Sequence, residues 1–181
     1  IGKCNAPAYG FRGTTDNKLY GPTSTPFDLN YNSGGSSGGS AAAIAKGLVL
    51  IAEGGDAGGS IRIPASCCNL YGFKAGVGTL PNVCRPDAYS TTHPYCCSGG
   101  LTKCVKDSVI LLSYMSRYNS RDPMSCLCNT NWLKEYNEPI NNLKIAYTED
   151  FNLFPVDENV KKIFNEAIKV LKNAGYNIEP V

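Results

Sequence analysis

Two segments of the chain are rich in glycine and serine: GGSSGGSAAA at residues 34–43 and GGDAGGSIRIPA at residues 54–65. Glycines beside a serine let backbone N–H groups approach a reacting oxygen, because no Cβ atom stands in the way. Backbone donors placed in this manner stabilise the oxyanion of a tetrahedral intermediate. The two segments therefore indicate an acyl-transfer site that includes Ser36 and Ser60.

Secondary structure can be predicted outward from these segments. The alanine-rich residues 37–46 predict a helix, and Gly47 follows where a C-cap glycine would lie. Residues 48–52 are short, apolar and partly β-branched, which predicts a strand buried on both faces. We expect the glycine segment 54–59 to form a loop and residues 60–67 to form a short helix.

The rest of the chain alternates between strand and helix patterns, which predicts an α/β fold. Turn residues are frequent in residues 1–35 and 76–102, so we expect loops there. Apolar periodicity predicts strands at residues 71–75, 143–147 and 177–181, and helices at residues 107–118 and between an N-cap at Asp157 and Gly175. The strand–helix–strand order at the end of the chain implies a parallel pair of strands.

Composition narrows the class of protein. The chain has 181 residues, of which 43% are hydrophobic and 18% are charged, as in ordinary globular domains. A net charge of +2 is too small to indicate a nucleic-acid or anionic-membrane partner. The longest apolar run, residues 48–52, is too short to span a bilayer. Because the first residues show no signal-peptide pattern, we expect a cytoplasmic protein.

Nine cysteines are present, an odd number that includes two adjacent pairs. A secreted disulfide framework is therefore not expected. The spacings also differ from the Cys-x₂₋₄-Cys pairs of structural zinc sites. We expect free thiols, no metal and no cofactor.

The glycine segments also allow three other interpretations. A phosphate-binding loop requires a lysine directly after its glycines, and neither segment has one in that register. A Ser-His-Asp hydrolase would have to use the one histidine, His93. Residues 34–38 satisfy Gly-x-Ser-x-Gly, but residues 27–33 make a poor strand, which that motif needs before it. A purely structural turn would account for one Gly-Gly-Ser but not for two matched segments.

The order of residues across 34–65 resembles the amidase signature family, as do residues 13–17, 20–23, 26–28, 71–74 and 99–102. The resemblance implies that Ser60 is the nucleophile and that Ser36 is a bridging serine whose peptide bond is cis. It also implies an oxyanion hole made by the backbone N–H groups of Ala57, Gly58, Gly59 and Ser60, with supporting roles for Ser37, Asp56 and Arg62.

A Ser-cisSer-Lys relay also requires a lysine. In the family this lysine lies farther upstream of the bridging serine than the 35 residues available here, and Lys3, Lys18 and Lys46 are not in its sequence context. We therefore expect residues 1–181 to be the central portion of a single amidase signature domain, without its lysine-bearing and C-terminal parts. The implied fold is a mixed, twisted β-sheet covered by helices and incomplete in this chain, with little activity on its own.

Three functions stay open. The first is an amidohydrolase that cleaves a small-molecule carboxylic amide through a seryl acyl-enzyme, the second a subunit of an amidotransferase complex, and the third a non-catalytic scaffold. Ile63 favours a general amidase, similar to 6-aminohexanoate cyclic dimer hydrolases, because the transamidating subunit usually has glutamine there. The oligomeric state and the acyl and amine specificity are left open.

Overall fold

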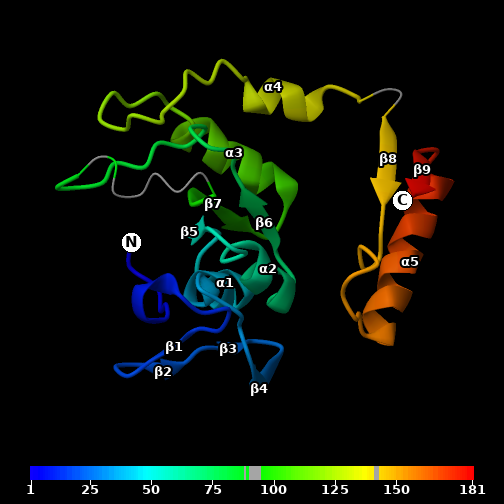
Figure 1. Ribbon diagram of the computed structural model, residues 1–181, viewed down its shortest axis with the longest axis horizontal. Coiled ribbons are helices and arrows are strands. Elements are labelled where there is room, and N and C mark those ends of the chain that lie inside the picture. The colour runs from blue at the N-terminus through cyan, green and yellow to red at the C-terminus, as the bar shows by residue number, and fades with distance from the viewer. Residues whose placement is uncertain (88, 90–94, 141–142) are drawn as a thin grey trace. The chain divides into compact units, whose positions relative to one another are not determined.

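The computed structural model describes residues 1–87, 89, 95–140 and 143–181 (Figure 1). These residues form two compact units, Ile1–Asn137 and Glu138–Val181. The helices of the first unit are η1 (Ala8–Gly10), α1 (Gly38–Ala45), α2 (Arg62–Cys67), α3 (Val105–Met115) and α4 (Trp132–Asn137). Its strands are β1 (Asp16–Asn17), β2 (Gly21–Pro22), β3 (Ser24–Thr25), β4 (Asp28–Asn32), β5 (Ile51–Asp56), β6 (Tyr71–Lys74) and β7 (Cys97–Thr102).

A three-stranded antiparallel sheet with the order β5-β7-β6 lies at the centre of the first unit. Successive residues of a strand face opposite sides of a sheet. A Cβ atom added to Gly99 would lie 2.9 Å from Ile61 Cδ1, whereas one added to Gly100 would lie 2.6 Å from Leu111 Cδ2 in α3. Helices α1 and α2 therefore cover one face of the sheet and α3 covers the other (Figure 1).

The core of the first unit consists of two clusters of buried side chains. The larger one joins α1, α2 and β7 and contains Ala41, Ile44, Ile61, Ala65, Cys68 and Leu101. The smaller one lies around α3 and contains Ala75, Leu80 and Leu112. Burying an aliphatic side chain of this size stabilises a fold by about 1.5–3 kcal/mol. The larger cluster therefore fixes α1 and α2, which begin within the two serine segments, shortly after Ser36 and Ser60.

Strand β7 shows that the expected loop over residues 76–102 was wrong at its end. Residues 97–102, with the sequence CSGGLT, form the central strand of the sheet. Glycine has low strand propensity, which is why the sequence did not predict a strand here. A Cβ atom on Gly99 would lie only 2.0 Å from the carbonyl oxygen of Phe73. Close approach of the neighbouring strand and helix therefore requires glycine at this position.

Strand β5 also differs from its prediction. It begins at Ile51 and continues through Asp56, so it includes part of the segment expected to form a loop. Leu48 and Leu50, which were expected to be buried in a strand, are 74% and 80% exposed. Among the described residues β5 pairs with β7 alone, so it is an edge strand here.

Other elements confirm the sequence prediction. Helix α1 is followed by Gly47 at φ +81°, the left-handed conformation expected at a helix C-terminus. Helices α2 and α3 and strand β6 lie within a few residues of their predicted ranges.

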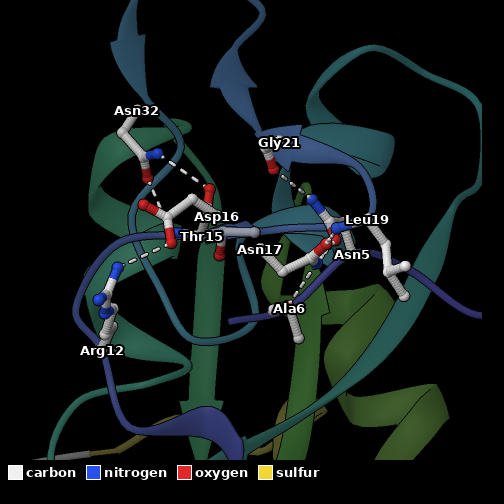
Figure 2. A network of polar contacts seen from close by, with 9 residues as sticks. All are labelled: Asn5, Ala6, Arg12, Thr15, Asp16, Asn17, Leu19, Gly21 and Asn32. Atoms are coloured by element: carbon white, nitrogen blue, oxygen red, sulfur yellow. Dashed lines mark hydrogen bonds and ion pairs between the residues drawn. The ribbon is translucent and has the colours of Figure 1, made fainter. Parts of the chain in front are cut away.

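Residues 1–35, expected to be irregular, contain two short antiparallel hairpins, β1-β2 and β3-β4. The Asn5 side chain connects the N-terminal segment to this region, because its Nδ2 donates to Thr23 Oγ1 at 2.8 Å and to the Gly21 carbonyl at 3.2 Å. Asn17 Nδ2 in turn donates to Asn5 Oδ1 and, at 2.9 Å, to the Ala6 carbonyl (Figure 2).

The second unit is a strand–helix–strand motif, as predicted. It consists of β8 (Lys144–Tyr147), α5 (Glu158–Asn173) and β9 (Asn177–Pro180), and β8 pairs with β9 in parallel. The Asp157 carboxylate caps α5 by accepting a hydrogen bond from the Asn159 N–H at 2.8 Å. The tilted ring pair Tyr147–Phe164, with centroids 5.9 Å apart, packs the helix on β8.

Candidate active site

Ser36 lies in the turn that enters α1, and the peptide bond between Gly35 and Ser36 is cis, as the resemblance implied. This turn packs against the backbone of the segment before β1. A Cβ atom on Gly35 would lie 2.7 Å from the Thr14 carbonyl and 2.8 Å from the Arg12 carbonyl. Only glycine allows the two backbones to approach this closely.

Two polar side chains that sequence reasoning missed hold the same turn in place. Thr15 is fully buried; its Oγ1 accepts from the Gly38 N–H at 3.1 Å and donates to the Ser36 carbonyl at 3.3 Å. Asn32 Oδ1 accepts from the Thr15 and Gly34 N–H groups at 2.9 and 3.0 Å, and the contacts between Asn32 and Thr15 are visible in Figure 2. Polar residues are common in turn segments, so their sequence signal is weak.

A backbone hydrogen bond joins the two serine segments. The Ser37 N–H donates to the Ser60 carbonyl at 3.1 Å, and the Ser37 Oγ donates to the Gly55 carbonyl at 3.4 Å. Both segments therefore meet on the face of the sheet that α1 and α2 cover. The Ser60 carbonyl accepts this hydrogen bond, and Ser36 is the residue before its donor, Ser37. Both Ser36 and Ser60 are partly exposed.

Asp56 fixes the shape of the second segment. Its fully buried carboxylate accepts hydrogen bonds from the Gly59 and Ile61 N–H groups at 2.7 and 3.1 Å. The Arg62 guanidinium forms a bidentate ion pair with the same carboxylate: its Nε donates to one oxygen and its Nη2 to the other, each at 2.9 Å. Burial alone would raise the pKa of Asp56, but the hydrogen bonds from the Arg62 side chain and from these N–H groups hold that pKa well below its usual value. Asp56 is therefore the charged centre of the turn.

This geometry changes one part of the expected oxyanion hole. The Gly59 N–H, expected to face the oxyanion, donates to Asp56 instead. The N–H groups of Ala57, Gly58 and Ser60 have no hydrogen-bond acceptor among the residues that the structure describes. A Cβ atom on Gly58 would meet nothing within 4 Å, so this part of the turn is open to an approaching group.

A cleft of about 840 Å³ lies beside the first serine segment. Its lining includes the hydroxyl-bearing residues Ser36, Ser37 and Ser40 and the first five residues of β5. The N-terminal residues 1–6, which include Lys3, also line it.

Other sequence expectations concern residues outside this site. His93, the base of the alternative triad, lies outside the described residues. In the described part of the chain, no group of three or more His, Cys, Asp and Glu side chains is arranged to bind a metal ion. No helix in that part is both long enough and apolar enough to cross a membrane. Unpaired thiols are found at Cys4, Cys67, Cys68, Cys96, Cys97, Cys104, Cys126 and Cys128.

Comparison with known proteins identifies the family of the chain. The family model described as Amidase matches residues 1–181, the whole chain. The chain therefore belongs to the amidase signature family. Its fold is that of a solved bacterial aryl acylamidase of this family, with a TM-score of 0.90 and 39% identity over 98% of this chain and 36% of that one.

Relatives in the family have different activities. The chain is 34% identical to a glutamyl-tRNA(Gln) amidotransferase subunit of Thermotoga maritima, covering 100% of this chain and 38% of that protein. It is also 34% identical to an acylamidase of Rhodococcus erythropolis, covering 98% of this chain and 37% of that protein. The structure of 6-aminohexanoate cyclic dimer hydrolase complexed with substrate matches with a TM-score of 0.87 and 28% identity over 100% of this chain and 38% of that one. The chain thus spans less than two fifths of each of these relatives.

Proposed function

We propose that the protein is an amidohydrolase that cleaves a small-molecule carboxylic amide through an acyl-enzyme on Ser60. The observation that carries this proposal is the 3.1 Å hydrogen bond from the Ser37 N–H to the Ser60 carbonyl. It brings the nucleophile's segment against the segment of Ser36, as a proton relay between the two hydroxyls requires. The similarity to acylamidases supports the same reaction.

In the proposed reaction, Ser60 Oγ attacks the amide carbonyl carbon while its proton passes to Ser36 Oγ, which gives its own proton to a neutral lysine. The carbonyl oxygen becomes an oxyanion, and the N–H groups of Ala57, Gly58 and Ser60 are the available donors for it. The C–N bond then breaks, and the amine leaves with a proton returned through Ser36. Water cleaves the acyl ester by the same route and restores Ser60.

The lysine of this relay is proposed to lie outside residues 1–181. Lys3 lines the cleft, but its side chain is exposed, whereas a lysine that serves as a base is desolvated. We further propose that the chain is the central portion of a single amidase signature domain, which its coverage of 38% of the Thermotoga maritima relative supports. Unpaired thiols are typical of a reducing compartment, which supports a cytoplasmic location.

Active-site labelling of the full-length protein tests this function. A fluorophosphonate should modify Ser60, and mass spectrometry should locate the adduct there. Ser60→Ala should abolish labelling, and Ser36→Ala should slow it by about 10²–10⁴-fold, the usual contribution of general base catalysis. Ser66→Ala, at an exposed serine of α2, is the matched control and should label normally. Absence of labelling in the unaltered protein would show a non-catalytic scaffold.

A second candidate, a subunit of an amidotransferase complex, is favoured by the similarity to the Thermotoga maritima protein, which equals that to the acylamidase. Ile63 argues against it. Release of ammonia from simple amides by the purified protein without a partner would decide for the hydrolase.

A further inference from the structure

One peptide group, between Ser36 and Ser37, connects the two serine segments to a third part of the chain. Its N–H, which belongs to Ser37, donates to the Ser60 carbonyl at 3.1 Å. Its carbonyl, which belongs to Ser36, accepts a hydrogen bond from Thr15 Oγ1 at 3.3 Å. The peptide group is therefore held at one end by the Thr15 hydroxyl and at the other end by the residue proposed as the nucleophile.

The Thr15 hydroxyl holds this turn at two points. Besides donating to the Ser36 carbonyl, its oxygen accepts a hydrogen bond from the Gly38 N–H at 3.1 Å. The Thr15 side chain is fully buried, and a Cβ atom added to Gly38 would lie 2.8 Å from Thr15 Cβ. Rotation of the peptide group between Ser36 and Ser37 would therefore break the bond to Thr15 at one end and the bond to Ser60 at the other.

The backbone of Thr15 is itself fixed, mainly by the Asn32 side chain. Asn32 Oδ1 accepts from the Thr15 N–H at 2.9 Å, and Asn32 Nδ2 donates to the Thr15 carbonyl at 3.0 Å (Figure 2). The same carbonyl accepts from the Thr23 N–H at 2.9 Å. Because both polar backbone groups of Thr15 are bonded, its hydroxyl is a fixed support for residues 36–38.

The position of the Ser36 hydroxyl decides how well the proposed relay works, because proton transfer requires the two hydroxyls within hydrogen-bonding reach. The Ser36 Cα atom carries both the peptide group that Thr15 holds and the Cβ atom that bears the hydroxyl. A turn of that peptide group therefore moves the hydroxyl, and a displacement of about 1 Å can slow a reaction about 10²-fold. The Thr15 side chain bonds the backbone of the turn, so it acts on the relay through the position of Ser36.

We propose that Thr15 is a positioning residue that sets the distance between the Ser36 and Ser60 hydroxyls through the peptide group between Ser36 and Ser37. This inference rests on the proposed function, since it concerns the rate of the same proton relay. It assigns to a buried hydroxyl an effect on the reaction that is separate from its contribution to stability. Loss of that hydroxyl should slow the bond-forming step and leave binding unchanged.

The test measures fluorophosphonate labelling of the full-length protein at several probe concentrations, which separates the binding constant KI from the rate constant kinact. In the labelling step the bond between Ser60 Oγ and phosphorus forms, fluoride leaves phosphorus, and the Ser60 proton passes to Ser36. Thr15→Val keeps the shape of the side chain but removes the hydroxyl. We expect kinact to fall by about 10–10²-fold with KI unchanged. Thr15→Ser keeps the hydroxyl and loses only a methyl group, so it should retain kinact.

Thr102→Val is the matched control. Thr102 is also fully buried, and its Oγ1 donates to a backbone carbonyl, that of Cys104 before α3, at 2.8 Å. Its replacement should lower the urea midpoint of unfolding, as Thr15→Val does, and leave kinact unchanged. An equal loss of kinact in Thr102→Val and Thr15→Val would overturn the inference, because general destabilisation would then explain both.

Other outcomes also count against Thr15 while leaving Ser60 as the nucleophile. These are an unchanged kinact in folded Thr15→Val, a rise in KI in place of the fall in kinact, and a Thr15→Ser variant as slow as Thr15→Val. If Thr15→Val does not fold, Thr15→Cys replaces it, because a thiol is a weak hydrogen-bond donor. Equal kinact in Thr15→Cys and Thr15→Ser would then overturn the inference. If the unaltered protein is not labelled at Ser60, the proposed function fails and this inference fails with it.

Discussion

Asp56 holds together the turn before Ser60, the proposed nucleophile. Asp56→Asn removes the charge that pairs with Arg62 and replaces one acceptor oxygen by an amide group, which cannot accept from the Gly59 and Ile61 N–H groups as the carboxylate does. We expect the free energy of unfolding to fall by about 2–3 kcal/mol, since hydrogen bonds to a charged acceptor are worth more than neutral ones. Urea denaturation measures this change.

Asp16→Asn is the control for that substitution. Its ion pair with Arg12 is exposed on both sides, so the loss should stay below about 1 kcal/mol. Equal losses in the two variants would show that Asp56 does not organise the turn.

The same carboxylate makes the free energy of unfolding depend on pH, in a direction that follows from its pKa. Its pKa in the folded protein is lowered from the usual value of 3.8, so its contribution to stability is fully present above that value. The contribution is lost as pH falls below about 4 toward the folded pKa, because the unfolded state then takes up the proton first. The difference in unfolding free energy between the unaltered protein and Asp56→Asn should therefore be constant from about pH 5 to 7 and shrink in acid. A difference that grew in acid would contradict this role of Asp56.

At the level of elements, the central strand β7 depends on glycine. Gly99→Ala would place a Cβ atom 2.0 Å from the Phe73 carbonyl oxygen, a backbone atom that cannot rotate away. Overpacking of this kind costs about 1–3 kcal/mol, and we expect the upper part of that range. Gly55→Ala in the neighbouring strand meets nothing within 4 Å and should cause no loss. Thermal unfolding of both variants makes the comparison, and similar midpoints would show that β6 does not approach Gly99 of β7 this closely.

The elements also show what sequence can and cannot predict here. Helix α5 was predicted because its apolar period and its Asp157 cap are local signals. The segments of Ser36 and Ser60 were found from their glycines. Strand β7 was missed because its glycines are selected by contacts with residues distant in sequence, such as Phe73. Thr15 and Asn32 were missed for the same reason, since their roles exist only after the chain folds.

For the molecule as a whole, the first unit holds both serines and the cleft, and its edge strand β5 is preceded by two exposed leucines, Leu48 and Leu50. An exposed edge strand and exposed leucines are features that proteins usually cover. Together with the 38% coverage of the Thermotoga maritima relative, this supports the proposal that the reaction needs more chain than these residues.

That proposal leads to a prediction about the 181-residue chain on its own. If the relay lysine lies outside it, the fluorophosphonate should label Ser60 in the isolated chain about 10²–10⁴-fold more slowly than in the full-length protein, since a missing general base costs that much. Circular dichroism should first show that the isolated chain keeps its helices, so that slow labelling reflects the missing base and not unfolding. Rapid labelling would place the base within the chain, and Lys3→Ala would then identify it, because Lys3 lines the cleft beside Ser36.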